Sequence, residues 1–102
     1  MAQISLIISL LIFSTLFHFH YSIDLVAYEN CNFVGNDIGL LKNIYSVDNC
    51  ATLCKEQPLC THFAWNPDAS RCYLKRTKTL KAAFDSYEQV RRLNCGMYRL
   101  RF

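Results

Sequence analysis

The chain lacks the features that mark several other classes of protein. Its 102 residues contain no internal repeat and no low-complexity segment, and they leave room for one domain at most. No Asn-x-Ser/Thr sequon occurs, so N-glycosylation is not expected. After residue 22 there is a single histidine, His62, and the carboxylates form no paired motif. The sequence therefore offers no ready general acid–base pair, and we predict that the protein is not an enzyme.

Charge is absent from residues 1–22, which contain no Lys, Arg, Asp or Glu. Residues 4–17 are apolar apart from Ser and Thr. This length is typical of the hydrophobic region of a signal peptide and is short for a membrane span, which needs about 20 residues. We expect a signal peptide at residues 1–22, cleaved after Ser22, and a secreted, extracellular domain at residues 23–102. An uncleaved membrane anchor is the alternative.

All six cysteines follow this segment. An even number of cysteines in a short secreted chain indicates three disulfides, and the sequence alone allows about 15 ways of pairing them. Such links suit a small domain, because it buries only a modest core. Cys54, Cys60 and His62 could in principle bind zinc. However, the spacing of the two cysteines is wider than the usual two to four residues, so no metal site or other cofactor is expected.

Local sequence patterns predict one helix and several strands. Ser46 suits an N-cap, Asp48 suits the first turn, and Pro58 disfavours helix at the residue before it, so a helix is expected at residues 47–56. Strands are expected at 23–28, 40–45, 61–65 and 71–75, with turns at 34–39 and 66–70. The expected core side chains are Phe63, Trp65, Tyr73 and Leu74.

Residues 77–93 are ambiguous. Apolar residues recur there at helical spacing, which favours a helix; they are Leu80, Ala83, Phe84, Tyr87, Val90 and Leu93. Residues 96–102 end with alternating apolar side chains, as in a strand. The local pattern thus predicts a second helix followed by a last strand.

Four short motifs become recognisable when they are taken together. They are Phe33-Val-Gly-Asn-Asp37-Ile, Cys50-x3-Cys54-x5-Cys60, Phe63-Ala-Trp65-Asn-Pro and Cys72-Tyr-Leu-Lys75. In these motifs the chain resembles the PAN/apple domain family over about residues 28–96. The resemblance implies an α+β fold, a small disulfide-rich domain in which a curled antiparallel sheet cradles one α-helix. It also implies a strand near residues 87–93, where the local pattern favours a helix, and we expect the strand because tertiary context overrides propensity in a small sheet.

The resemblance further implies which cysteines pair, and it leaves none of them free as a nucleophile. Two bridges would tie the helix and the turn after it to the sheet, and the third would join the two ends of the domain. The implied pairs are Cys50–Cys72, Cys54–Cys60 and Cys31–Cys95.

Charge is distributed unevenly along the domain. Residues 23–70 hold two bases and six acids, whereas residues 71–102 hold nine bases and two acids. The C-terminal third is therefore a candidate surface for an anionic partner, although an ordinary solvated face is the simpler interpretation. The candidate anion-binding residues are Lys75, Arg76, Lys78, Lys81, Arg91 and Arg92.

The resemblance implies a non-catalytic module that recognises an extracellular protein or a carbohydrate. Some members of the family bind glycans of the heparan sulfate type, which makes a sulfated glycan one candidate ligand of the basic residues, with a protein partner as an equal candidate. The alternative is a secreted inhibitor or toxin-like peptide, stapled by its disulfides, that acts on a protein target. Nucleic acid is not an expected partner, because few bases lie outside one segment.

Overall fold

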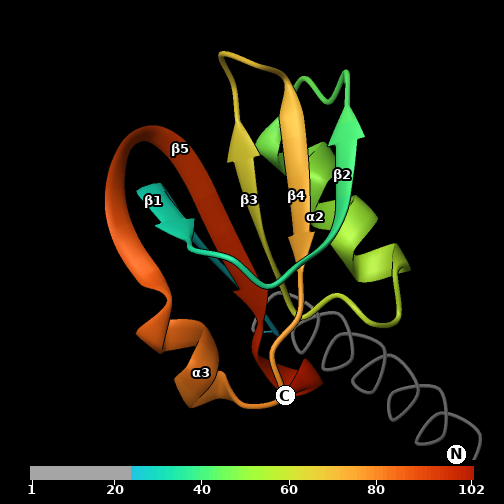
Figure 1. Cartoon of the computed structure of the whole chain (residues 1–102). Coiled ribbons are helices and arrows are strands. Elements are labelled where there is room, and N and C mark those ends of the chain that lie inside the picture. Colours follow the sequence, from blue (N-terminus) through green and yellow to red (C-terminus); the bar gives the residue numbers. More distant parts are fainter. Residues whose placement is uncertain (1–23) are drawn as a thin grey trace, which may run out of the picture.

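The computed structural model describes residues 24–102 and shows one curled antiparallel sheet with a helix packed on it (Figure 1). The strands are β1 (Leu25–Phe33), β2 (Asp37–Lys42), β3 (His62–Asn66), β4 (Arg71–Lys75) and β5 (Tyr87–Tyr98), and their order in the sheet is β1-β5-β3-β4-β2. The helices are α2 (Val47–Glu56), α3 (Leu80–Asp85) and the 3-10 helix η1 (Arg99–Arg101). The predicted α+β fold class is confirmed.

The signal peptide predicted at residues 1–22 lies outside the described residues and stays a prediction. Within residues 24–102, no helix is both long enough and apolar enough to cross a membrane.

Helix α2 begins and ends where the local signals predicted. The Ser46 hydroxyl accepts a hydrogen bond from the amide of Asn49 (3.1 Å), and this bond satisfies one of the free amides of the first turn. The chain becomes extended at Gln57, directly before Pro58, as the steric effect of proline on its predecessor requires. The helix therefore presents its buried residues to the sheet over its whole length.

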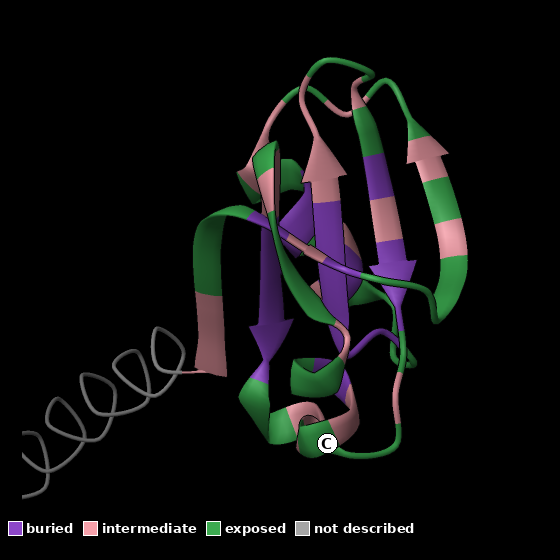
Figure 2. Ribbon diagram, turned by 60° about the vertical axis from the view of Figure 1, so that its left-hand side comes forward, coloured by how far each residue is buried: buried purple, intermediate pink, exposed green. Residues whose placement is uncertain are grey.

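Two clusters of buried side chains lie on the two faces of the sheet, and Figure 2 shows the buried strands between them. Because side chains alternate along a strand, Phe63 packs under α2 whereas its neighbour Ala64 packs on the opposite face. Of the predicted core residues, Phe63 and Leu74 are buried, and Trp65 and Tyr73 are half-buried. The first cluster contains Cys50, Ala51, Cys54, Cys60, Phe63, Cys72, Leu74 and Tyr98, and the second contains Cys31, Phe33, Ala64, Ala83, Cys95 and Met97.

Three disulfides fasten these layers, and all six of their cysteines are fully buried. One joins α2 to β4, one closes the turn between α2 and β3, and one joins β1 to β5. Their Cα–Cα distances lie within the usual range for a disulfide. The pairs are those that the resemblance implied: Cys50–Cys72 (5.4 Å), Cys54–Cys60 (5.2 Å) and Cys31–Cys95 (5.5 Å).

Strand β5 bends sharply, and the bend curls the sheet. Glu29 of β1 pairs with Asn94 and Cys31 pairs with Gln89, so residues 90–93 of β5 lie opposite Asn30 alone. The Asn30 side-chain oxygen accepts a hydrogen bond from the amide of Arg92 (3.1 Å). Such a bulge increases the local bend and twist. The first half of β5 therefore arches away from β3, as Figure 1 shows.

Several predicted boundaries are wrong. The helix favoured at 77–93 is limited to α3, because β5 begins at Tyr87 and pairs with β1, and the strand implied by the resemblance is present. The strand expected to the end of the chain stops at Tyr98, where η1 begins. The first strand extends to Phe33, and β2 begins at Asp37, inside the segment expected to be a turn. In each case backbone pairing with a distant strand decides the boundary.

Candidate functional site

Lys75 does not belong to an exposed cationic surface, contrary to the prediction. Its side chain is only 4% exposed, and its ammonium donates hydrogen bonds to the Asp37 carboxylate and to the carbonyl oxygen of Gly35 (3.0 Å). Both acceptors lie at the segment that links β1 to β2, where Gly35 has a left-handed φ of 74°. Because a buried ammonium needs such partners, Lys75 serves to fasten this segment across the end of β4.

A groove of about 260 Å³ opens beside this ion pair. Its lining comes from all five strands and from the segment between β1 and β2. Among residues 24–102, the Tyr73 hydroxyl and the Asn66 amide nitrogen have no hydrogen-bond partner, and Asn32 donates to the Glu88 carboxylate (3.5 Å). Amide, phenol and carboxylate groups around one hollow suit a ligand rich in hydroxyl groups. The polar residues of the lining are Asn32, Asp37, Asn66, Tyr73, Lys75 and Glu88.

Four exposed bases lie next to the groove residues Asn66 and Leu93, at the end of the sheet where β5 bends, and we call them the apical rim: Lys42, Arg71, Arg91 and Arg92. Lys42 pairs with Arg71 across β2 and β4. Arg92 forms an ion pair with Asp68 in the β3–β4 loop (3.4 Å), which brings the bend of β5 to this loop. Within the described part of the chain, the other three side chains have no hydrogen bond or ion pair. Only Arg91 and Arg92 of this group belong to the anion-binding set predicted from the sequence.

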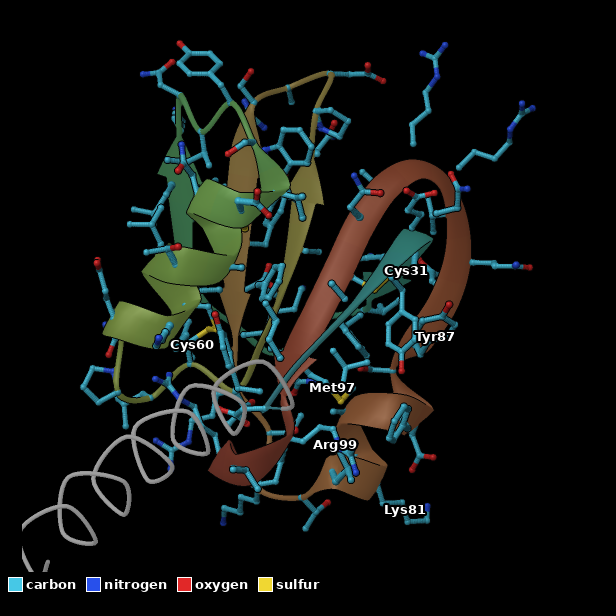
Figure 3. The ribbon with its side chains drawn as sticks, turned by 180° about the vertical axis from the view of Figure 1, so that it is seen from behind. Cys31, Cys60, Lys81, Tyr87, Met97 and Arg99 are labelled. Atoms are coloured by element: carbon cyan, nitrogen blue, oxygen red, sulfur yellow. A yellow bond between two sulfur atoms is a disulfide. The ribbon has the colours of Figure 1, made fainter. Side chains whose placement is uncertain are left out.

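The remaining predicted bases lie at the opposite end of the sheet. Arg76 and Lys78 are exposed on the link between β4 and α3. Lys81 lies on α3, and its hydrogen bond to Asp85 (2.8 Å) raises the pKa of Lys81 above its ordinary value. Figure 3 places Arg99, which lies outside the anion-binding set predicted from the sequence, beside α3 and near Lys81. We call Arg76, Lys78, Lys81 and Arg99 the basal set.

Thr61 forms hydrogen bonds to the backbone beside three residues of the basal set. Its amide donates to the carbonyl oxygen of Lys75 (2.9 Å), its hydroxyl accepts from the amide of Thr77 (3.2 Å), and its carbonyl oxygen accepts from the amide of Tyr98 (2.9 Å). Arg76, Lys78 and Arg99 directly follow these partners in the sequence, so the backbones of the three bases all lie next to Thr61. Among residues 24–102, three of these basal side chains have no hydrogen bond or ion pair, namely Arg76, Lys78 and Arg99.

Arg101, by contrast, is used inside the fold. Its Nη1 donates to the carbonyl oxygens of Cys54 (2.8 Å), Gln57 (2.9 Å) and Cys60 (2.9 Å), and its Nη2 donates to that of Lys55. These carbonyl groups belong to the C-terminal end of α2 and the turn after it, where a helix leaves acceptors unpaired. Arg101 thus joins the end of the chain to the end of α2.

His62 is fully buried and is not placed to act as a general base. Its Nδ1 lies 2.8 Å from the Thr61 hydroxyl oxygen, and the ring of Phe33 packs edge-on at 4.9 Å. Nε2 has no partner among residues 24–102. Burial and, secondarily, the charge of Lys75 lower the pKa of His62 to about 4. The imidazole is therefore neutral at pH 7.

The zinc-binding alternative is wrong for Cys54 and Cys60, because these residues form a disulfide and zinc binds the thiolate form. Across residues 24–102, no group of three or more His, Cys, Asp or Glu side chains is arranged to hold a metal ion.

The free energy of unfolding is expected to fall as the pH is lowered from about 6.5 to about 4. The pKa of His62 is about 4 in the folded protein and 6.5 in the unfolded chain. The unfolded chain therefore binds the proton more tightly throughout this window. The contribution is complete above pH 6.5, and the expected loss is about 3 kcal/mol, measured by denaturant unfolding at a series of pH values. A His62→Gln variant does not titrate at this position. The assignment fails if that variant loses as much stability over the same window.

Two comparisons with known proteins bear on this arrangement. A family model described as PAN domain matches residues 23–98, a span that includes all five strands and all six cysteines. A search of curated protein sequences found no match.

Proposed function

We propose that this chain, which belongs to the PAN domain family, is a non-catalytic module that binds a sulfated carbohydrate at the groove and the apical rim. PAN domains are in general modules that bind proteins or carbohydrates. The observation that carries the proposal is that a polar groove with unpaired hydrogen-bonding groups meets a row of exposed bases.

The groove and the rim supply the two kinds of contact that a sulfated sugar needs. Hydroxyl groups of the sugar can donate to Glu88 and accept from Asn66 or Tyr73. Sulfate groups can accept charge-assisted hydrogen bonds from Arg71 and Arg91, whose planar guanidinium groups match two oxygens at once. Neither kind of contact requires an existing interaction of these two arginines to be broken.

An extracellular location fits this ligand. Disulfides persist in oxidising compartments, and this small domain contains three of them in its core. Secretion through the signal peptide expected at residues 1–22 is part of the proposal.

Removing three charges from the apical rim is expected to weaken the binding of a heparin-derived tetrasaccharide by about 10- to 100-fold. Each exposed charge contact is worth roughly 0.5–1 kcal/mol, and the variant removes three of them. The variant combines Lys42→Gln, Arg71→Gln and Arg91→Gln in the full chain, expressed in a secretory host and purified with its disulfides formed. Binding is followed by NMR at the backbone amides of Asn66 and Tyr73, so that only occupancy of the groove is measured.

The matched control removes the same net charge from the basal set, through Arg76→Gln, Lys78→Gln and Arg99→Gln. Its groove amides should titrate within about threefold of the unaltered protein, because distant charges are screened at physiological salt. Equal weakening by both variants shows that overall charge, and not this site, determines the affinity. If the groove amides of the unaltered protein do not respond to the tetrasaccharide, the proposal is wrong.

A further inference from the structure

The structure carries a second cationic surface, and we infer that it makes the domain a cross-linker of sulfated glycan chains. The basal set binds one chain while the apical rim binds another. The inference takes the class of ligand from the proposed function, but it uses different residues and predicts a different behaviour.

Strand β4 separates the two surfaces. Arg71 begins this strand and Arg76 follows its last residue, so that five steps of about 3.3 Å place the two residues about 16 Å apart. Figure 3 shows the bend of β5 at one end of the molecule and Lys81 and Arg99 at the other. The separation is about twice the Debye length of roughly 8 Å at physiological salt. Each surface therefore attracts anions on its own.

Three of the four side chains of the basal set are unpaired, and Thr61 fixes the backbone beside them. Arg76, Lys78 and Arg99 have no hydrogen bond or ion pair in the described part of the chain, and Asp85 is already paired with Lys81. Hydrogen bonds to Thr61 fix the backbone on both sides of Arg76 and directly before Lys78 and Arg99. Because this backbone is already fixed, only the side chains must be ordered when a polyanion binds.

Two sites at opposite ends of the sheet change what the domain does with a long ligand. A glycan segment bound along the apical rim leaves the basal set free at the opposite end of the sheet. A second glycan chain can then bind there, and many such bridges connect many chains. The avidity of a network of this kind depends on both ends of the domain being active.

The test mixes the secreted, oxidised protein with long heparin chains and follows the particle size by light scattering. The unaltered protein should form complexes at least tenfold larger in scattering intensity than those of either triple variant. Both triple variants, apical and basal, should still be retained on immobilised heparin. With the tetrasaccharide, the amides of Lys78 and Lys81 should shift with an affinity that the apical substitutions leave unchanged within about threefold.

A control of equal net charge separates two-site binding from simple neutralisation. Three exposed polar residues of α2 and its C-cap are made acidic through Asn49→Asp, Thr52→Glu and Gln57→Glu, which leaves both cationic surfaces intact. This control should still cross-link heparin. If it fails as completely as the triple variants, total charge is the cause and the inference is overturned. Tetrasaccharide binding at the groove without any enlargement of heparin complexes also overturns it, and leaves the proposed function standing.

Discussion

Simultaneous replacement of Cys50 and Cys72 by alanine is expected to leave little folded domain in the absence of denaturant. The bridge closes a sequence separation of 22 residues, for which chain entropy gives about 3 kcal/mol. Both cysteines are fully buried against Phe63 and Leu74 under α2, so their loss leaves a cavity that costs about 1–2 kcal/mol more. A single core in a domain of this size rarely supplies more than about 3–5 kcal/mol.

The measurement is far-UV circular dichroism and thermal unfolding of the purified double variant. Its control is the pair Cys54→Ala and Cys60→Ala, which opens a separation of only 6 residues and should cost about 2 kcal/mol. That control should remain folded, with a lower midpoint of unfolding. A Cys50/Cys72 variant with the thermal stability of the unaltered protein contradicts the prediction.

The parts of the fold that the sequence predicted well are those with local causes. Helix α2 follows from a capping hydroxyl at Ser46 and a stop before Pro58, both of which act within a few residues. The β3–β4 hairpin follows from strand composition on either side of a turn that contains Pro67. The family resemblance then supplied the disulfide partners, which spacing alone left undetermined.

The parts that could not be predicted depend on long-range pairing. The bend of β5 arises where Asn30 opposes residues 90–93, and the sequence near either segment does not reveal this register. The prediction of the candidate anion-binding residues likewise rested on the assumption that bases close in sequence are close in space. The sheet instead buries Lys75 and separates Arg76 from Arg92. Arg76 follows the last residue of β4, whereas Arg92 pairs with Asp68 in the loop that precedes β4. The groove draws its lining from five strands and has no local signature.

Arg101→Met is expected to lower the free energy of unfolding by about 3 kcal/mol. The substitution removes four hydrogen bonds from one guanidinium to carbonyl oxygens at the end of α2, and it leaves those acceptors with poorer partners. It also removes the contact of the guanidinium with the ring of Tyr98, at 5.1 Å. Arg101→Lys should recover only part of the loss, because an ammonium cannot reach the same set of acceptors as a planar fork. Denaturant unfolding measures all three proteins.

Arg99→Met is the matched control, because it removes the same charge at a position two residues from Arg101. The Arg99 side chain has no hydrogen bond or ion pair among residues 24–102. Its free energy of unfolding should stay within about 0.5 kcal/mol of that of the unaltered protein. The same variant should weaken glycan binding at the basal set, where Arg99 is a proposed contact. We therefore expect Arg101 to contribute to stability and Arg99 to contribute to glycan binding. If both substitutions destabilise the domain equally, the hydrogen bonds of Arg101 are not what fastens η1 to α2.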